Sequence, residues 1–141
     1  IVDTLSAAGI HSPHLNGPYT TQAGPVCHLR TDIAFPLRSS DAIKLVGNLH
    51  PTPAVSGLPR MEALQLIAKY EAHERLFYTG FLGRISPEKT DFYVNLRCAQ
   101  LVEDAIYLYV GGGFTVDSVP SHEWQETVNK SKTLRAVIEQ F

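Results

Sequence analysis

GGGFTVDSVPSHEWQETVNK, residues 111–130, is the stretch around which the rest of the chain is organised. Its three glycines directly follow a strand-like run, and a backbone without Cβ atoms lets a ligand approach the amides closely. Pro120 and Ser121 then predict a helix start, with Ser121 as the N-cap and Glu123 in the first turn, where the helix dipole favours an acidic side chain. The stretch therefore predicts a glycine turn that leads directly into an amphipathic helix.

Three charged residues of this helix share one face. At about 100° per residue, Glu123, Glu126 and Lys130 point in the same direction. Two carboxylates and an ammonium beside a glycine turn form a candidate site for a divalent cation and an anionic ligand, and hard oxygen ligands suit Mg²⁺. On spacing alone, however, an ordinary solvated face with a Glu126–Lys130 pair is the favoured interpretation.

Length and composition set the broad class of protein. The chain has 141 residues, a net charge of −2 and 44% hydrophobic residues, which indicates one globular domain or part of one and no nucleic-acid or basic membrane surface. No apolar run approaches the roughly 18 residues that span a bilayer. Cys27 and Cys98 match no metal-ligand spacing, and we expect buried free thiols in a reducing, cytoplasmic setting.

Periodicity and turn residues predict helices alternating with antiparallel strands. The expected elements are a helix end at 1–10, a loop at 11–25, a strand at 26–35, a helix from 39 to 49, a stiff proline-rich loop at 49–59, a helix at 59–70, and a meander of strands at 77–85, 91–102 and 105–110.

Three further residues are candidates for ligand binding, each with an ordinary alternative. Arg97 is the only formal charge in the middle of its expected strand, so it needs a carboxylate or a bound anion, unless it lies on a solvated sheet face. Tyr78 either packs half-buried or directs its hydroxyl into a cleft. His50 lies in the proline-rich loop, which is either the wall of an active site or a simple connection between helices.

Three segments together resemble the chorismate-utilising enzyme family. They are LHPTPAVSGLP at 49–59, YTGFLG with VNLRCAQL within 78–101, and YVGGGF with SHEWQETVNK within 109–130, in the order and at the approximate spacings of that family. The family includes isochorismate synthases, anthranilate synthase component I and aminodeoxychorismate synthase component I. The resemblance implies an α+β fold in which helices lie outside layers of antiparallel sheet.

Within the family, the loop at 49–59 resembles the isochorismate synthases most. The aminating and salicylate-forming members usually carry Thr where this chain has Ala54, so the resemblance implies that water rather than ammonia is delivered to the ring. An aminating or salicylate-forming relative stays an alternative. A second alternative, from another class of protein, is a non-catalytic module that binds chorismate without turnover.

The resemblance implies conversion of chorismate to isochorismate in menaquinone or siderophore synthesis. Water adds at C2 of the ring while the C4 hydroxyl leaves, with Mg²⁺ holding the ring carboxylate. The resemblance implies that Glu126 is a metal ligand, that Glu123 is a second carboxylate for the metal, and that Lys130 contacts the substrate carboxylate. It implies that the enolpyruvyl carboxylate is bound by Arg97, Tyr78 and the amides of Gly111, Gly112 and Gly113. It also implies that His50 contacts the ring and that Ala54 forms a wall on the nucleophile side.

The family's remaining catalytic groups have no counterpart in these residues. A base-like Lys, a general-acid Glu and a further Mg²⁺-binding Glu lie upstream in isochorismate synthases, and IVDTL at 1–5 resembles the segment that follows the last of them. We therefore expect residues 1–141 to be the C-terminal portion of one chorismate-binding catalytic domain, without turnover by itself. Open sheet edges and an uncovered apolar face then predict an oligomer or an association with the N-terminal portion.

Overall fold

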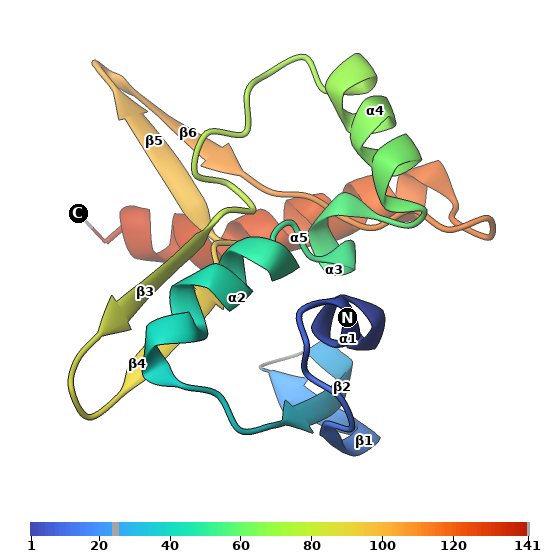
Figure 1. Ribbon diagram of the computed structural model, residues 1–141. Helices are drawn as coiled ribbons and strands as arrows, with labels where there is room; N and C mark the ends of the chain where they lie inside the picture. The colour runs from blue at the N-terminus through green and yellow to red at the C-terminus, as the bar shows by residue number, and fades with distance from the viewer. Residues whose placement is uncertain (24–25, 141) are drawn as a thin grey trace. The chain divides into compact units, whose positions relative to one another are not determined.

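The computed structural model describes residues 1–23 and 26–140, and the chain divides into two compact units, Ile1–Leu49 and His50–Phe141 (Figure 1). Helices and antiparallel strands are both present in each unit, which confirms the α+β class. The strands described form three separate two-stranded antiparallel sheets. The expected fold class is therefore right, while the expected sheet layers are reduced to hairpins in these residues.

The first unit places a hairpin between two helices of the sequence. Its elements are α1 (Val2–Ala7), β1 (His14–Ala23), β2 (Val26–Ala34), the 3-10 turn η1 (Ser39–Asp41) and α2 (Ala42–Leu49). Helix α1 stops before Gly9, whose φ of +84° is a left-handed conformation that glycine adopts without steric cost. Helices α1 and α2 pack together, and Leu5 and Leu45 are the buried apolar side chains of this unit among the residues described.

The expected loop at 11–25 is wrong for residues 14–23, which form β1; Gly24 and Pro25 lie outside the described residues. Pairing with β2 supplies backbone hydrogen bonds that local turn composition cannot reveal. Within β1, Gly17 and Pro18 are accommodated because the register shifts between Asn16 and Tyr19, as expected where proline cannot donate to the ladder. The side chain of Tyr19 then donates a 2.5 Å hydrogen bond across the hairpin to Asp32.

The second unit carries the glycine turn and the long C-terminal helix. Its elements are α3 (Pro53–Ser56), α4 (Arg60–Tyr70), β3 (Phe81–Ile85), β4 (Thr90–Val94), β5 (Cys98–Val102), β6 (Ala105–Tyr109) and α5 (Pro120–Ile138). Strand β6 packs against α5, and the segment between them holds the three glycines (Figure 1). The proline-rich loop contains only the single turn of α3, which agrees with the absence of a long regular element there.

The expected continuous strand at 91–102 is broken in the structure. β4 pairs with β3, β5 pairs with β6, and residues 95–97 belong to neither strand. Asn95 still exchanges backbone hydrogen bonds with the turn before β3, accepting from Thr79 and donating to Gly80. The chain then changes partner, so the expected meander becomes two hairpins. Arg97 consequently lies in the break and not in the middle of a strand.

Helix α5 also starts two residues earlier than the expected N-cap, Ser121, predicts. The N-cap is Val119 and Pro120 is the first helical residue, where its missing N–H and its fixed φ suit a helix. Ser121, the expected N-cap, therefore lies inside the first turn. Glu123 remains in the first turn, as the pattern predicts.

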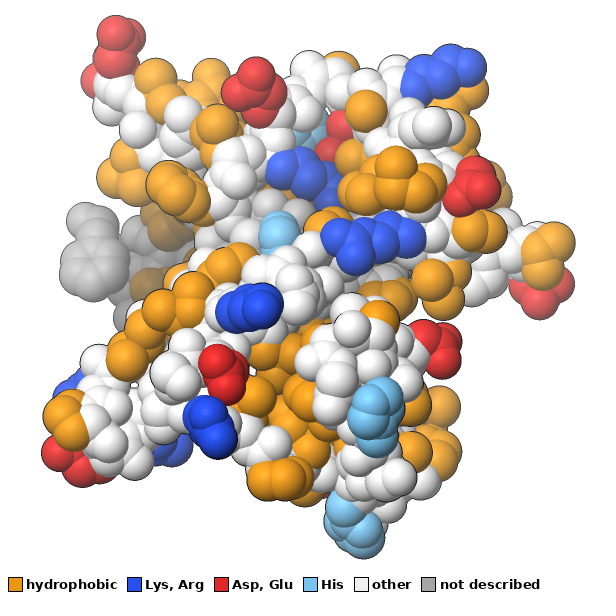
Figure 2. Space-filling view, viewed as in Figure 1, with side chains coloured by type: hydrophobic (Ala, Val, Ile, Leu, Met, Phe, Trp, Pro, Cys, Tyr) orange, Lys and Arg blue, Asp and Glu red, His pale blue; other side chains and the backbone are white. Residues whose placement is uncertain are grey.

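Apolar side chains reach the surface in both units, and Figure 2 shows many of them on one face of the molecule. In the described part of the second unit no apolar side chain is fully buried, and Phe77 and Leu101 are 84% and 78% exposed. This agrees with the expectation of an uncovered apolar face; the expected association with another chain or segment stays a prediction. The expectation of buried thiols is wrong for Cys27, which is exposed on its hairpin, whereas Cys98 is half-buried.

Candidate functional site

The glycine turn brings two carboxylates to one point. A Cβ atom added to Gly112 would lie 3.1 Å from Oε2 of Glu126 and 3.5 Å from Oε2 of Glu123. Both carboxylates come from the first two turns of α5, three residues apart, so they lie side by side on the same face. The missing side chain of Gly112 therefore leaves room in front of two convergent oxygen atoms.

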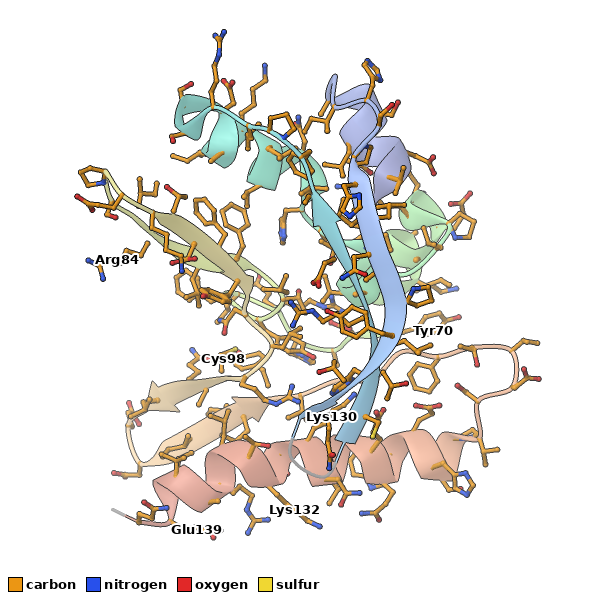
Figure 3. The ribbon with its side chains drawn as sticks, turned by 90° about the horizontal axis from the view of Figure 1, so that it is seen from below. Tyr70, Arg84, Cys98, Lys130, Lys132 and Glu139 are labelled. Carbon is orange, nitrogen blue, oxygen red and sulfur yellow. The ribbon has the colours of Figure 1, made fainter. Side chains whose placement is uncertain are left out.

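Lys130 joins this pair one helical turn further along α5. Its Nζ atom lies 3.1 Å from Oε1 of Glu126 and donates a 3.1 Å hydrogen bond to the carbonyl oxygen of Gly111. In Figure 3 the label of Lys130 lies on the opposite side of α5 from those of Lys132 and Glu139. The ammonium thus ties the helix face to the glycine turn, in agreement with the shared face that the spacing predicts.

Tyr78 approaches the same turn from the segment before β3. A Cβ on Gly111 would lie only 2.5 Å from the Tyr78 hydroxyl oxygen, so this approach requires glycine. The pKa of Tyr78 is raised, chiefly because burial disfavours the phenolate, while the positive charges of Arg75 and Arg97 act in the opposite direction. Tyr78 therefore stays a neutral hydroxyl donor at neutral pH, beside a glycine and close to positive charge.

Arg97 has an exposed guanidinium with unused hydrogen-bonding capacity. Its one hydrogen bond among the described residues runs from Nη1 to the carbonyl oxygen of Leu96, at 2.9 Å. A guanidinium carries five N–H donors, so most of them stay available to a ligand. Among the described residues no carboxylate pairs with Arg97, so the solvated side chain is what is observed, and its binding of an anionic ligand stays a prediction.

His50 and Ala54 belong to the proline-rich segment that precedes α4 in the same unit. The His50 ring meets the Phe81 ring edge-on with centroids 5.4 Å apart, and its backbone carbonyl accepts a 2.8 Å hydrogen bond from Arg60. Ala54 is exposed on α3. Among the described residues no recorded hydrogen bond, ion pair or ring contact links His50 or Ala54 to the Glu126–Lys130 pair, so their expected roles stay predictions.

A network centred on Arg75 was not anticipated from the sequence. Arg75 binds both carboxylate oxygens of Glu71, donates to the carbonyl oxygen of Val55 at 2.9 Å, and reaches Oγ1 of Thr79 at 3.4 Å. The hydrogen bonds from Arg75 to Glu71 hold the pKa of Glu71 below its ordinary value, although burial opposes the effect. Arg75 therefore fixes the turn that carries Tyr78 to α3, in the loop that follows His50.

Two smaller supports were also missed. Asn95 donates a 3.0 Å hydrogen bond from Nδ2 to the carbonyl oxygen of Phe77, and Ser118 donates a 2.6 Å hydrogen bond to Oε1 of Glu123. The Glu71–Arg75 spacing of four residues was the one available signal in the sequence. The remaining contacts join segments that are distant in sequence or lie in irregular turns, where periodicity carries no information.

A cavity of about 450 Å³ adjoins the Tyr78 turn. Arg75, Tyr78, Asn95, Cys98 and Tyr109 contribute to its walls. Burial raises the pKa of the Cys98 thiol, which keeps it a neutral thiol at neutral pH.

The donor set at Gly112 is compatible with a hard divalent cation. Carboxylate oxygens are the ligands that Mg²⁺ prefers, and Mg²⁺ binds through one or two carboxylates while it keeps several water molecules. Residues 1–23 and 26–140 contain no group of three or more His, Cys, Asp or Glu side chains arranged to hold a metal. Glu123 and Glu126 thus fit a partial, water-completed Mg²⁺ site and not a closed protein cage.

This combination of a glycine turn, paired carboxylates and a nearby ammonium occurs in a chain that a family model described as "Chorismate binding enzyme" matches over residues 1–139. The chain belongs to the chorismate-binding enzyme family, as the resemblance predicted.

The chain is similar to curated relatives of two kinds, isochorismate synthases and an anthranilate synthase component. The chain is 38% identical over 122 residues to isochorismate synthase MenF of Escherichia coli strain K12, covering 86% of this chain and 28% of that protein. It is 38% identical over 125 residues to the salicylate biosynthesis isochorismate synthase of Pseudomonas aeruginosa, covering 87% and 26%. It is 37% identical over 116 residues to anthranilate synthase component 1 of Aquifex aeolicus, covering 81% and 24%.

The chain spans about a quarter of the length of these curated relatives, between 24% and 28%. Within the described part of the chain, no helix has both the length and the apolar character needed to cross a membrane.

Proposed function

We propose that this chain supplies the metal-binding and carboxylate-binding side of an isochorismate synthase active site. The observation that carries the proposal is the convergence of Glu123 and Glu126 at Gly112, with Lys130 bonded to Gly111, in a chain similar to isochorismate synthases. Chorismate carries two carboxylates, and two separate groups in this unit suit them: the carboxylate–ammonium cluster with its cation, and Arg97 with Tyr78.

In this proposal Glu126 and Glu123 hold Mg²⁺, and Lys130 contacts the ring carboxylate. Mg²⁺, when bound, supplies positive charge that neutralises that carboxylate. Arg97 binds the enolpyruvyl carboxylate through paired N–H donors, and the Tyr78 hydroxyl and the amides of Gly111–Gly113 add further donors. These residues orient chorismate while a water molecule adds at C2 and gives up a proton, and the C4 hydroxyl takes up a proton and leaves as water.

His50 and Ala54 shape the reacting edge of the ring in the same proposal. The edge-on contact with Phe81 limits the positions of the His50 ring, and the hydrogen bond from Arg60 to the His50 carbonyl oxygen holds the backbone that carries it. Ala54 has no hydroxyl with which to hold or redirect a nucleophile. We assign binding and orientation to these residues and no proton transfer.

An aminating reaction is the second candidate, because anthranilate synthase component 1 of Aquifex aeolicus is similar to the chain at 37% identity. A product assay separates the two. The full-length protein is incubated with chorismate and Mg²⁺, with and without ammonium, and the products are resolved chromatographically. Isochorismate in both reactions supports the proposal. An amino-substituted product that requires ammonium supports the second candidate, and Mg²⁺-dependent binding of chorismate without any product supports a non-catalytic module.

A further inference from the structure

Ser118 lies in a tight turn just before α5, and its hydroxyl has a defined orientation. The backbone N–H of Thr115 donates to the Ser118 hydroxyl oxygen at 3.0 Å, and the backbone N–H of Ser118 donates to the Thr115 carbonyl oxygen at 3.1 Å. A hydroxyl has a single proton to donate. Because the oxygen already accepts from Thr115, the proton is directed elsewhere, and it goes to Oε1 of Glu123 at 2.6 Å.

This hydrogen bond is not an ordinary helix cap. An N-cap serine accepts hydrogen bonds from backbone N–H groups of the first turn. The N-cap of α5 is Val119, and the helix start has no side-chain cap. The backbone N–H of Glu123 instead bonds to the Val119 carbonyl oxygen. The Ser118 hydroxyl therefore serves the Glu123 carboxylate and not the helix backbone.

The two oxygen atoms of Glu123 consequently have different surroundings. Oε1 accepts from Ser118, whereas Oε2 faces Gly112, where Oε2 of Glu126 also points. A carboxylate bound through one oxygen loses rotational freedom about its last torsion. The free oxygen is then held toward the point where the carboxylates converge before any cation binds.

We propose that Ser118 is a positioning residue that orients Glu123 for binding a divalent cation together with Glu126. The inference deepens the proposed function and rests on it, since it concerns the same cation site. Residues that hold a metal ligand in place commonly change metal affinity 10- to 100-fold when they are mutated. Ser118 should therefore influence cation affinity although its oxygen contacts Glu123 and not the cation.

The test is a Mg²⁺ titration by calorimetry of the full-length protein and three variants. Ser118→Ala removes the donor, and its dissociation constant for Mg²⁺ should rise about 10- to 100-fold. Ser118→Thr keeps the hydroxyl and should restore an affinity close to that of the wild type. Ser131→Ala is the matched control, because Ser131 is a serine of α5 whose hydroxyl donates a 2.8 Å hydrogen bond to the Val128 carbonyl oxygen and not to a carboxylate. It should leave the Mg²⁺ affinity unchanged.

The outcomes separate this inference from the proposed function. Wild-type affinity in Ser118→Ala overturns the inference, even if that variant melts at a lower temperature, because the role is then only structural. Equal losses in Ser118→Ala and Ser131→Ala, or no Mg²⁺ binding by the wild type, overturn it as well. If Mg²⁺ binds and depends on Ser118 but the product assay yields no isochorismate, the inference stands and the proposed function falls.

Discussion

The Glu71–Arg75 pair and the Glu126–Lys130 pair have the same spacing of four residues, but their surroundings differ. Arg75 binds both oxygens of Glu71 and also reaches Val55 and Thr79, and the two side chains of the pair are 24% and 29% exposed. Lys130 forms an ion pair with one oxygen of Glu126. The Glu126 side chain is 48% exposed, and its other oxygen points toward Gly112. Satisfied charges of the first kind stabilise a fold, whereas charges with remaining capacity can bind a ligand.

The largest effect should come from the pair with remaining capacity. Glu126→Ala removes one of two convergent carboxylates, and isochorismate formation by the full-length protein should fall at least about 100-fold, equivalent to about 2.7 kcal/mol. Its free energy of unfolding without Mg²⁺ should change little, because Glu126 is 48% exposed, an i,i+4 pair contributes only about 0.3–0.5 kcal/mol, and Lys130 keeps its hydrogen bond to Gly111. Steady-state kinetics over a Mg²⁺ series measure this, and normal activity with normal Mg²⁺ dependence would refute the metal assignment.

The internally satisfied pair should show the reverse behaviour. Arg75→Met leaves the partly buried Glu71 without its donors and frees the Val55 carbonyl, so the free energy of unfolding should fall by about 2 kcal/mol. Urea denaturation measures the change. Arg135→Met is the matched control, since Arg135 forms an exposed i,i+4 pair with Glu139 and should lose no more than about 0.5 kcal/mol. Equal losses in the two variants would remove the distinction between satisfied and available charges.

Arg97 tests whether an exposed guanidinium serves the substrate. Arg97→Lys keeps the positive charge but loses the planar pair of donors, and the KM for chorismate should rise about 10-fold, equivalent to about 1.4 kcal/mol. The stability should not change, because the one hydrogen bond of Arg97 in the described residues goes to its neighbour Leu96. An unchanged KM would assign Arg97 to the solvated surface.

The smallest expected effect is a change in the free energy of unfolding at acidic pH. Hydrogen bonds from Arg75 lower the pKa of Glu71 in the folded state, so this stabilisation is present above the unfolded value of 4.5 and is lost as the pH falls through the folded value. The difference in unfolding free energy between the wild type and Arg75→Met should therefore shrink as the pH is lowered below about 4.5. Denaturation at several pH values measures it, and a difference that grows in acid would contradict the sign.

The sequence predicted most helices and the site's shared face, but it failed where pairing partners decide. The helix ending at Tyr70 and the Glu123–Glu126–Lys130 face follow from local spacing, which a single segment carries. The strand at 14–23 and the break at Arg97 depend on partner strands, which local composition does not specify. The metal ligands, substrate contacts and association of the chain stay predictions.

By itself, the sequence determined the family, the glycine turn and the order of charges along α5, because motifs and helical periods are local properties. Only the tertiary structure decided which of those charges are satisfied. It placed Arg75 within hydrogen-bonding distance of Val55 and Thr79. It also directed the Ser118 hydroxyl to Glu123 and brought Gly112 next to the carboxylates of Glu123 and Glu126. The physical reason is that a hydrogen bond depends on distances between atoms in space, and residues far apart in the chain reveal those distances only after folding.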